Sequence, residues 1–231
     1  MSLADGMDIL WSDQNPLLPS ALAMALYLRA GWATVLLWLL WAALGMFAPR
    51  GGLRAHRAVG MGLAVLLAGW VMWPGPASPA YWLGLAFNAP SISSVFLCAG
   101  FGWQQWREVG AAGAGGATVK GWSKAFLVLG VVAGYVLLLD TLALLPAQVY
   151  AWGFSPVALV CVSVLSVMPC VALNPLQRAN AWTLAMPLGL LLFLLTRLPT
   201  GNVWDVVLDP LLWVALHFCL AITVIRERRQ R

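Results

Sequence analysis

Charged side chains are scarce in this sequence. Only 9% of its 231 residues are Asp, Glu, Lys or Arg, whereas 62% are hydrophobic, and the mean hydropathy is +0.86. A water-soluble domain carries charge on roughly a quarter of its residues, because its surface faces water. This chain has too few charges to cover such a surface. We therefore expect an integral membrane protein whose outside is solvated by the lipid bilayer.

Histidine and lysine are rarer still, and the cysteines show no pattern. Two histidines, His56 and His217, cannot make a three-histidine zinc site, and they do not share the membrane depth that a bis-histidine haem needs. Both lysines flank one predicted loop, which excludes a retinal Schiff base within a helix. The four cysteines lack CxxC spacing, and no glycine-rich phosphate loop is present. We expect no cofactor, no metal and no nucleic-acid partner.

Long apolar runs predict the helices of the fold. A helix needs about 20 apolar residues to cross the hydrocarbon core. Seven runs approach or exceed that length and predict spans at about residues 22–47, 58–73, 80–103, 125–145, 154–173, 181–198 and 207–225. The second run is short, and its helix can begin near Leu53 with Arg54 and Arg57 reaching the interface. The expected fold is all-α, a single domain over residues 1–231 with about seven transmembrane helices.

Basic residues gather in alternate connections of this predicted bundle. The connections after the first, third and fifth spans, together with the C-terminal tail, hold 11 of the 13 Lys and Arg residues. By the positive-inside rule these segments face the cytoplasm. The sequence thus predicts an N-terminus outside the cytoplasm and a C-terminus inside it. The preference for arginine, alanine and glycine suggests a bacterial source, so the expected location is the inner membrane.

Ionisable residues near the predicted spans gather toward the outer leaflet. They are Arg29, Asp140, Arg197, Asp205, Asp209 and His217. A charge at the centre of a membrane helix costs roughly 2.5–3.5 kcal/mol on insertion scales, which makes such residues candidates for function. Because an isolated charge at this depth is expensive, we expect Arg29 and Asp140 to point inward, within reach of an opposite charge or a polar group, with Asp209 and Arg197 as the alternatives. A purely structural role for Asp140 would be to hold Arg29 or Arg197.

Several of these residues also have a structural interpretation. Asp209 stands before Pro210 and can cap the last helix. Asn202 and Asp205 resemble a capping pair for a short helix along the membrane surface. His217 fits an ordinary core histidine. The same residues therefore support either a functional site or a set of structural contacts.

The third predicted span is interrupted by polar residues in its outer half. They are Asn88, Pro90, Ser91, Ser93 and Ser94. Proline frees a carbonyl one turn earlier, and nearby Ser or Asn can satisfy the backbone. Broken helices of this kind line binding sites in transporters, so Asn88, Ser91 and Ser94 are possible cavity-lining residues. The alternative is a simple proline kink.

Two glycines of the fourth predicted span, Gly130 and Gly134, stand four residues apart. This GxxxG spacing places both on one helix face, where the missing side chains let a second helix approach closely. The spacing predicts close packing without naming the neighbour.

Three classes of function fit these features. The first is a non-catalytic multi-pass subunit, or an assembly or scaffold protein, of a larger membrane complex. The second is a small-solute or proton-coupled transporter whose periplasm-facing polar cavity is lined by Arg29, Asp140, Arg197 and His217. The third is a membrane enzyme or quinone-reactive subunit that uses the same outer residues, for example His217 with Asp140 as a proton acceptor.

The subunit or scaffold class is preferred, because the sequence lacks residues that a transporter or an enzyme would need. A transporter needs a second gate, and the predicted spans carry no charged positions in their inner halves. An enzyme needs a nucleophile and a base, and no Ser or Cys stands at an obvious helical spacing from His217. The expected partners are the lipid bilayer and other membrane proteins, with a small-molecule ligand if the protein is a transporter.

Overall fold

The computed structural model describes residues 18–47, 53–108, 124–172 and 181–229, and within these ranges it is helical without strands. The longer helices are α2 (Ala21–Phe47), α3 (Leu53–Met72), α5 (Ile92–Glu108), α6 (Lys124–Thr141), α8 (Pro156–Ala172), α10 (Ala181–Thr196) and α12 (Pro210–Arg229). The shorter ones are α4 (Pro79–Phe87), α7 (Val149–Trp152) and α11 (Trp204–Val207). The all-α prediction is confirmed for this part of the chain.

Three helices, α2, α6 and α12, are long and apolar enough to cross a membrane. Shorter apolar helices cover Ala58–Met72, Ile92–Gln104, Pro156–Met168 and Thr183–Thr196. Many large apolar side chains lie on the outside, including Val65 at 72% exposure and Leu195 at 77%. Surfaces of this kind are favourable against lipid and costly against water. The structure therefore supports a membrane-associated protein.

Six of the predicted spans coincide with single helices. α3 begins at Leu53, as the sequence allows. α6 ends at Thr141 rather than near residue 145, because Ala143 adopts a φ of 55° and the chain turns toward α7. The residues that carry much of the charge pattern, such as Arg50, Lys120 and Arg178, lie outside the described residues, as do residues 1–17.

The span predicted over residues 80–103 has to be corrected, because it is not one helix. α4 ends at Phe87, α5 begins at Ile92, and the four residues between them are not helical. Asn88 adopts a φ of 64°, in the left-handed region, and Pro90 has no N–H to continue the helical hydrogen bonds. A simple proline kink within one helix is therefore also wrong, since four consecutive non-helical residues separate α4 from α5.

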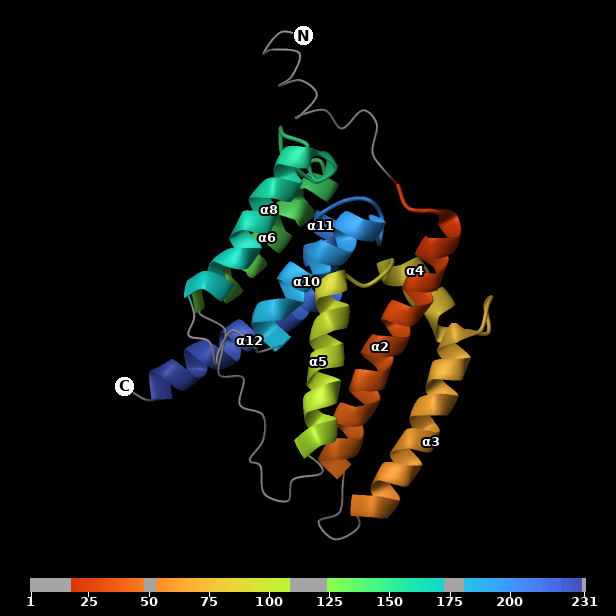
Figure 1. Cartoon of the computed structure of the whole chain (residues 1–231). Helices are drawn as coiled ribbons and strands as arrows, with labels where there is room; N and C mark the ends of the chain where they lie inside the picture. The colour runs from red at the N-terminus through yellow and green to blue at the C-terminus, as the bar shows by residue number, and fades with distance from the viewer. Residues whose placement is uncertain (1–17, 48–52, 109–123, 173–180, 230–231) are drawn as a thin grey trace.

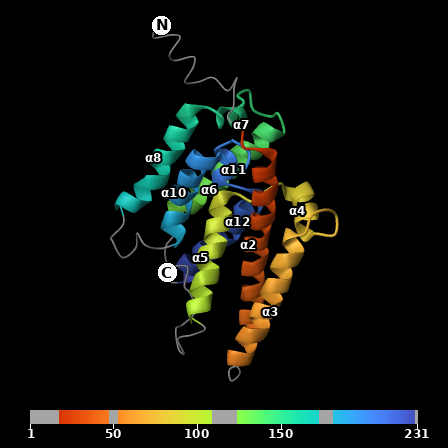
Figure 2. The ribbon, with the colours of Figure 1, turned by 45° about the vertical axis from the view of Figure 1, so that its right-hand side comes forward.

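The helices form a bundle in which α2 lies between α3 and α5 (Figures 1 and 2). α10 packs on the other side of α5 and also contacts α8 and α11. α4 contacts α2 and α3, while α12 packs against α6. This arrangement places the turn between α4 and α5 close to the start of α12.

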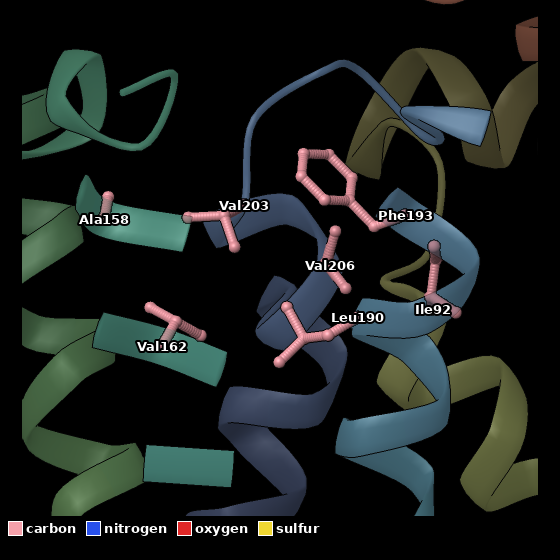
Figure 3. Packing of buried hydrophobic residues seen from close by; sticks show 7 residues of the cluster. All are labelled: Ile92, Ala158, Val162, Leu190, Phe193, Val203 and Val206. Carbon is pink, nitrogen blue, oxygen red and sulfur yellow. The ribbon is translucent and has the colours of Figure 1, made fainter. Parts of the chain in front are cut away.

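Seven buried apolar residues form the core beside α11. They are Ile92, Ala158, Val162, Leu190, Phe193, Val203 and Val206, and their side chains converge from α5, α8, α10 and the α11 segment (Figure 3). Val203 and Val206 are fully buried. Because these valines anchor α11, the neighbouring Asp205 and Asp209 occupy fixed positions near the start of α5.

The two glycines of α6 face α12. A Cβ atom added to Gly130 would lie 2.7 Å from Cδ1 of Leu216, and one added to Gly134 would overlap the indole of Trp213. The Trp213 Nε1–H donates to the carbonyl oxygen of Val131 at 3.0 Å. The GxxxG spacing thus predicts the close packing correctly, and the structure identifies α12 as the neighbour.

Candidate functional site

The turn between α4 and α5 is held by side chains of α2. The Tyr27 hydroxyl donates to the carbonyl oxygen of Pro90 at 2.9 Å, and the Trp32 Nε1–H donates to that of Asn88 at 3.0 Å. A Cβ atom added to Gly31 would lie 2.8 Å from Cγ of Pro90, so glycine lets α2 approach the turn closely. The turn removes these two carbonyl groups from helical hydrogen bonding, and the side chains of Tyr27 and Trp32 supply hydrogen-bond donors in its place.

The Asp209 carboxylate joins the start of α5 to the start of α12. Oδ2 accepts from the Ser91 backbone N–H at 2.8 Å and from the Ser94 hydroxyl at 2.5 Å, while Oδ1 accepts from the Leu212 N–H at 2.8 Å. Asp209 is only 8% exposed. Three hydrogen bonds and the positive ends of two helix dipoles offset the cost of burying its charge. Asp209 therefore caps α12, as its place before Pro210 predicts, and it also binds the start of α5.

Ser91 and Ser94 complete what we call the Asp209 junction, defined by Ser91, Ser94 and Asp209. The buried Ser91 hydroxyl accepts from the Ser94 N–H at 3.1 Å and lies 2.9 Å from the Ser94 hydroxyl oxygen, to which it donates. A serine before a helix that accepts from the third helical N–H is an ordinary N-cap. Ser94 in turn donates to Asp209. The Ser91 hydroxyl thus donates to Ser94, and the Ser94 hydroxyl donates to the carboxylate.

A cavity of about 500 Å³ lies beside the Asp209 junction, between α2, α5 and α12. Most of its wall is apolar, and Ser94, Gln104 and Asp209 contribute polar side chains to it. Of the three residues predicted to line a cavity, Ser94 does so. The other two, Asn88 and Ser91, hold the turn through backbone hydrogen bonds.

Asp205 lies in a second hydrogen-bonded group, in the connection between α10 and α12. Its Oδ2 accepts from the Tyr150 hydroxyl at 2.7 Å and from the Thr200 hydroxyl at 2.5 Å. Burial raises the pKa of Asp205, against the lowering effect of these two hydrogen bonds, and the charge of Asp209 adds to the rise. Burial and the charge of Asp205 likewise raise the pKa of Tyr150. The pair joins the α11 segment to α7.

Asn202 fixes the same two segments through the backbone. It is fully buried, and its Nδ2 donates to the carbonyl oxygen of Tyr150 at 2.9 Å while its Oδ1 accepts from the Trp204 N–H at 2.9 Å. The Trp204 Nε1–H donates to the carbonyl oxygen of Val149 at 2.9 Å. The predicted short helix therefore exists as α11, with Asn202 as its capping side chain. Asp205 bonds across to α7 instead of completing a capping pair.

Asp140 binds backbone rather than an arginine. At the end of α6 its two carboxylate oxygens accept from the Val149 N–H at 3.1 Å and from the Tyr150 N–H at 2.7 Å. The first N–H groups of a helix have no partner within it, so α7 offers donors that a carboxylate satisfies well. Asp140 thus has polar partners, but its partners are backbone N–H groups, and the structural pairing with Arg29 or Arg197 has to be corrected.

The two arginines have no carboxylate partner among the described residues, where the recorded ion pair joins Lys124 to Glu227 at 2.7 Å. Arg29 is half-buried on α2. The guanidinium carbon of Arg197, at the end of α10, lies 5.3 Å from the centre of the Phe193 ring. Such a cation–π contact is favourable and lets the charge lie against an apolar helix.

His217 lies in an aromatic group between α12 and α6. Its Nδ1 is 2.8 Å from the carbonyl oxygen of Trp213, so Nδ1 carries the proton in this contact. The rings of Tyr135 and Trp213 meet the imidazole edge-on, with centroids 5.5 and 4.8 Å away. These contacts fit the interpretation of His217 as a core histidine.

The ionisable residues predicted as one cluster are divided among several places. Asp209 joins Ser91 and Ser94, and Asp140 and Asp205 both reach Tyr150, one through its backbone and one through its hydroxyl. None of Arg29, Asp140, Arg197 and His217 lines the cavity beside Asp209. Within the described ranges, no three His, Cys, Asp or Glu side chains come together as a metal site.

Sequence reasoning missed three side chains that hold these places. Tyr150 had a usable signal, because it is a hydroxyl in the predicted outer connection next to the span that carries Asp140. Tyr27 and Trp32 had none, since aromatic residues occur throughout the apolar runs and a phenol or indole donor can serve any nearby carbonyl.

Comparison with known proteins gives no relative. A scan against protein-family models, a search of curated proteins and a search of solved structures each found no match. Function is therefore argued from the geometry of these residues.

Proposed function

We propose that the protein is a non-catalytic multi-pass subunit, or assembly scaffold, of a larger complex in the inner membrane. The observation that carries this proposal is the use made of its buried carboxylates. Asp140, Asp205 and Asp209 each accept two or three hydrogen bonds from neighbouring segments of the chain. A group that moves protons needs to face the reacting atom of a substrate. Asp140 and Asp205 face the protein's own helix ends and loops, and Asp209 uses three of its acceptor positions on them while also contributing to the wall of the cavity.

The three carboxylates together connect five elements, α5, α6, α7, α11 and α12, at one end of the bundle. Asp140 connects α6 to α7, Tyr150 of α7 connects to Asp205 of α11, and Asp209 connects the following chain to α5. A transporter that alternates between two openings needs helices that move past one another. An end locked in this way favours fixed helix faces that partner proteins can bind.

The proposal includes seven membrane segments, with α4 and α5 counted as one, and a cytoplasmic C-terminus. Two contacts between helix ends support the proposal that successive segments cross the membrane in alternating directions. Asp209 at the start of α12 meets Ser91 before α5, at the predicted outer side. Lys124 at the start of α6 meets Glu227 near the end of α12, at the predicted cytoplasmic side. Both contacts join ends that the charge pattern places on the same side of the membrane.

The test is to extract the protein from its own membrane in mild detergent and measure the composition of the particle. We expect a fixed ratio to at least one other membrane polypeptide. A photo-crosslinking residue should capture that same polypeptide from at least one of four exposed positions, Val65, Val132, Val160 and Val214. The matched control is Val71, a fully buried valine of α3, which should capture nothing outside the chain.

Two results would contradict the proposal. One is a particle that contains this chain alone, without crosslinks from any of the four exposed valines. The other concerns Asp205→Asn, in which an amide oxygen can still accept from Tyr150 and Thr200. If that variant keeps normal abundance and normal assembly but stops the growth that the wild-type gene supports, Asp205 has a chemical role.

A further inference from the structure

The cavity between α2, α5 and α12 arises from the way α12 packs. α12 is joined to α5 at its first residues by Asp209 and packs along α6. In Figure 1 the rest of α12 runs away from α5 and α2 toward the lower left. The space left between them measures about 500 Å³, within the range of about 300–1,000 Å³ typical of small-molecule sites.

The cavity is long, with the only buried carboxylate of its wall at one end. Its wall follows α5 from Ser94 to Gln104, a distance of about 15 Å at 1.5 Å per residue. The Asp209 junction lies at the Ser94 end. Between the two ends the wall is built mainly of apolar side chains such as Val35, Leu97 and Leu216. Trp38 also lines it, and its buried Nε1–H has no hydrogen-bond partner among the described residues. This shape fits one elongated apolar molecule with a polar group at one end.

The hydrogen-bonding capacity of the polar end determines which group it can take. Ser94 uses its proton on Asp209 and accepts from Ser91, so it has no donor to offer. Asp209 accepts three hydrogen bonds, and an ionised carboxylate has about four acceptor positions. At the Asp209 end, the capacity that remains is that of an acceptor. It favours a donor group and disfavours groups that only accept, such as an ether or a ketone.

We propose that this cavity binds a membrane-dissolved single-chain molecule whose head is a hydrogen-bond donor, a hydroxyl or an ammonium group. The head binds Asp209, and the chain runs along α5 toward Gln104. Such a ligand enters from the bilayer, because α2, α5 and α12 are apolar helices with lipid-facing surfaces. This inference does not depend on the identity of the partner subunits.

The experiment uses the full chain in phosphatidylcholine nanodiscs with photoreactive sixteen-carbon probes of matched chain. The three probes are an alcohol, a primary amine and the methyl ether of the alcohol. We expect the alcohol or the amine to label peptides of α5 or α12 about tenfold more than the ether at equal concentration, since the loss of one hydrogen bond to a charged group weakens binding by about that factor. The better of the two identifies the head group.

Two variants decide whether labelling comes from the cavity. Ala215 lines it, so Ala215→Phe should fill the space and reduce labelling by the better probe at least about tenfold. Val214 is the next residue, is 47% exposed and does not line the cavity, so Val214→Phe should label like the wild type. Both changes leave Asp209 and its caps intact. Equal labelling by all three probes, or labelling by the better probe that Ala215→Phe leaves unchanged, overturns the proposal.

Discussion

At the Asp209 junction a single carboxylate serves donors from two helices. Its three hydrogen bonds come from Ser91, Ser94 and Leu212. A hydrogen bond to a charged group contributes about 1.5–3 kcal/mol, and a buried donor left without an acceptor costs about 1–3 kcal/mol. The effect of a substitution here therefore depends on how many donors it leaves unpaired.

Asp209→Ala should lower the stability of the purified protein more than Ser94→Ala. The first change leaves three donors unpaired, whereas the second removes one donor and leaves the Ser91 hydroxyl without its acceptor. We expect a loss of several kcal/mol for Asp209→Ala and about 1–2 kcal/mol for Ser94→Ala, measured by thermal unfolding in detergent. Ser166→Ala is the control, because that hydroxyl bonds only within its own helix. Equal losses at positions 94 and 209 would contradict the bridging role of Asp209.

The sequence identifies the important acidic residues and the capping role of Asp209, but it does not identify the donors that Asp140 and Asp205 bind. The cost of burying a carboxylate singles out Asp140, Asp205 and Asp209 without any coordinates. It does not say which donor offsets that cost. An arginine was considered for Asp140 and a capping pair for Asp205, whereas the donors found are the N–H groups at the start of α7 and the hydroxyls of Tyr150 and Thr200. The first N–H groups of every helix have no partner within that helix. A carboxylate can therefore bind the N–H groups of a helix that starts nearby in place of the side chain of a distant arginine.

Among the elements, the turn between α4 and α5 departs furthest from expectation. The apolar run predicts one span over residues 80–103, since length and hydropathy count residues and do not record where the backbone turns. The polar residues at 88–94 give the only sequence signal of the turn. What makes the turn stable is supplied by α2, through Tyr27, Gly31 and Trp32.

Gly31→Ala should destabilise the protein, and Gly45→Ala in the same helix should not. A Cβ atom at position 31 would lie 2.8 Å from Cγ of Pro90, in a ring that cannot rotate away. No atom of a neighbouring segment lies within 4 Å of a Cβ atom at position 45. Alanine is a better helix former than glycine by about 0.5–1 kcal/mol, so the second change should be neutral or mildly stabilising. Melting temperatures in one detergent compare them, and a stabilising Gly31→Ala would show that α2 does not contact the turn closely.

For the molecule as a whole, helix positions follow from sequence better than helix neighbours do. Apolar length is enough to locate six helices, because the hydrocarbon core demands it. Packing partners are harder, since the lipid-facing and protein-facing sides of a membrane helix are both apolar. The sequence therefore predicts a close contact at Gly130 and Gly134 but not which helix makes it, and the structure shows that Trp213 of α12 packs there.

The predicted orientation is tested by labelling single cysteines in intact cells, with the four native cysteines replaced by alanine. Leu144 is 65% exposed in the segment that follows the end of α6 at Thr141, on the side that the charge pattern places outside the cytoplasm, so a cysteine there should react with a membrane-impermeant maleimide. Ala114 lies in a predicted cytoplasmic connection and should react only after the cells are opened. A reporter enzyme fused after Arg231 should be active in the cytoplasm. Reaction of position 114 from outside would reverse or break the seven-span topology.

The hydrogen bond between Ser91 and Asp209 also has a consequence for biosynthesis, because 118 residues separate its two ends. α5 leaves the ribosome long before α12 does. Until Asp209 is synthesised, the Ser91 N–H and the Ser94 hydroxyl have no carboxylate, and buried donors without acceptors are costly. The start of α5 is thus completed only once α12 is in place. A nascent chain that ends before Asp209 leaves these two donors without the carboxylate that they bind in the fold.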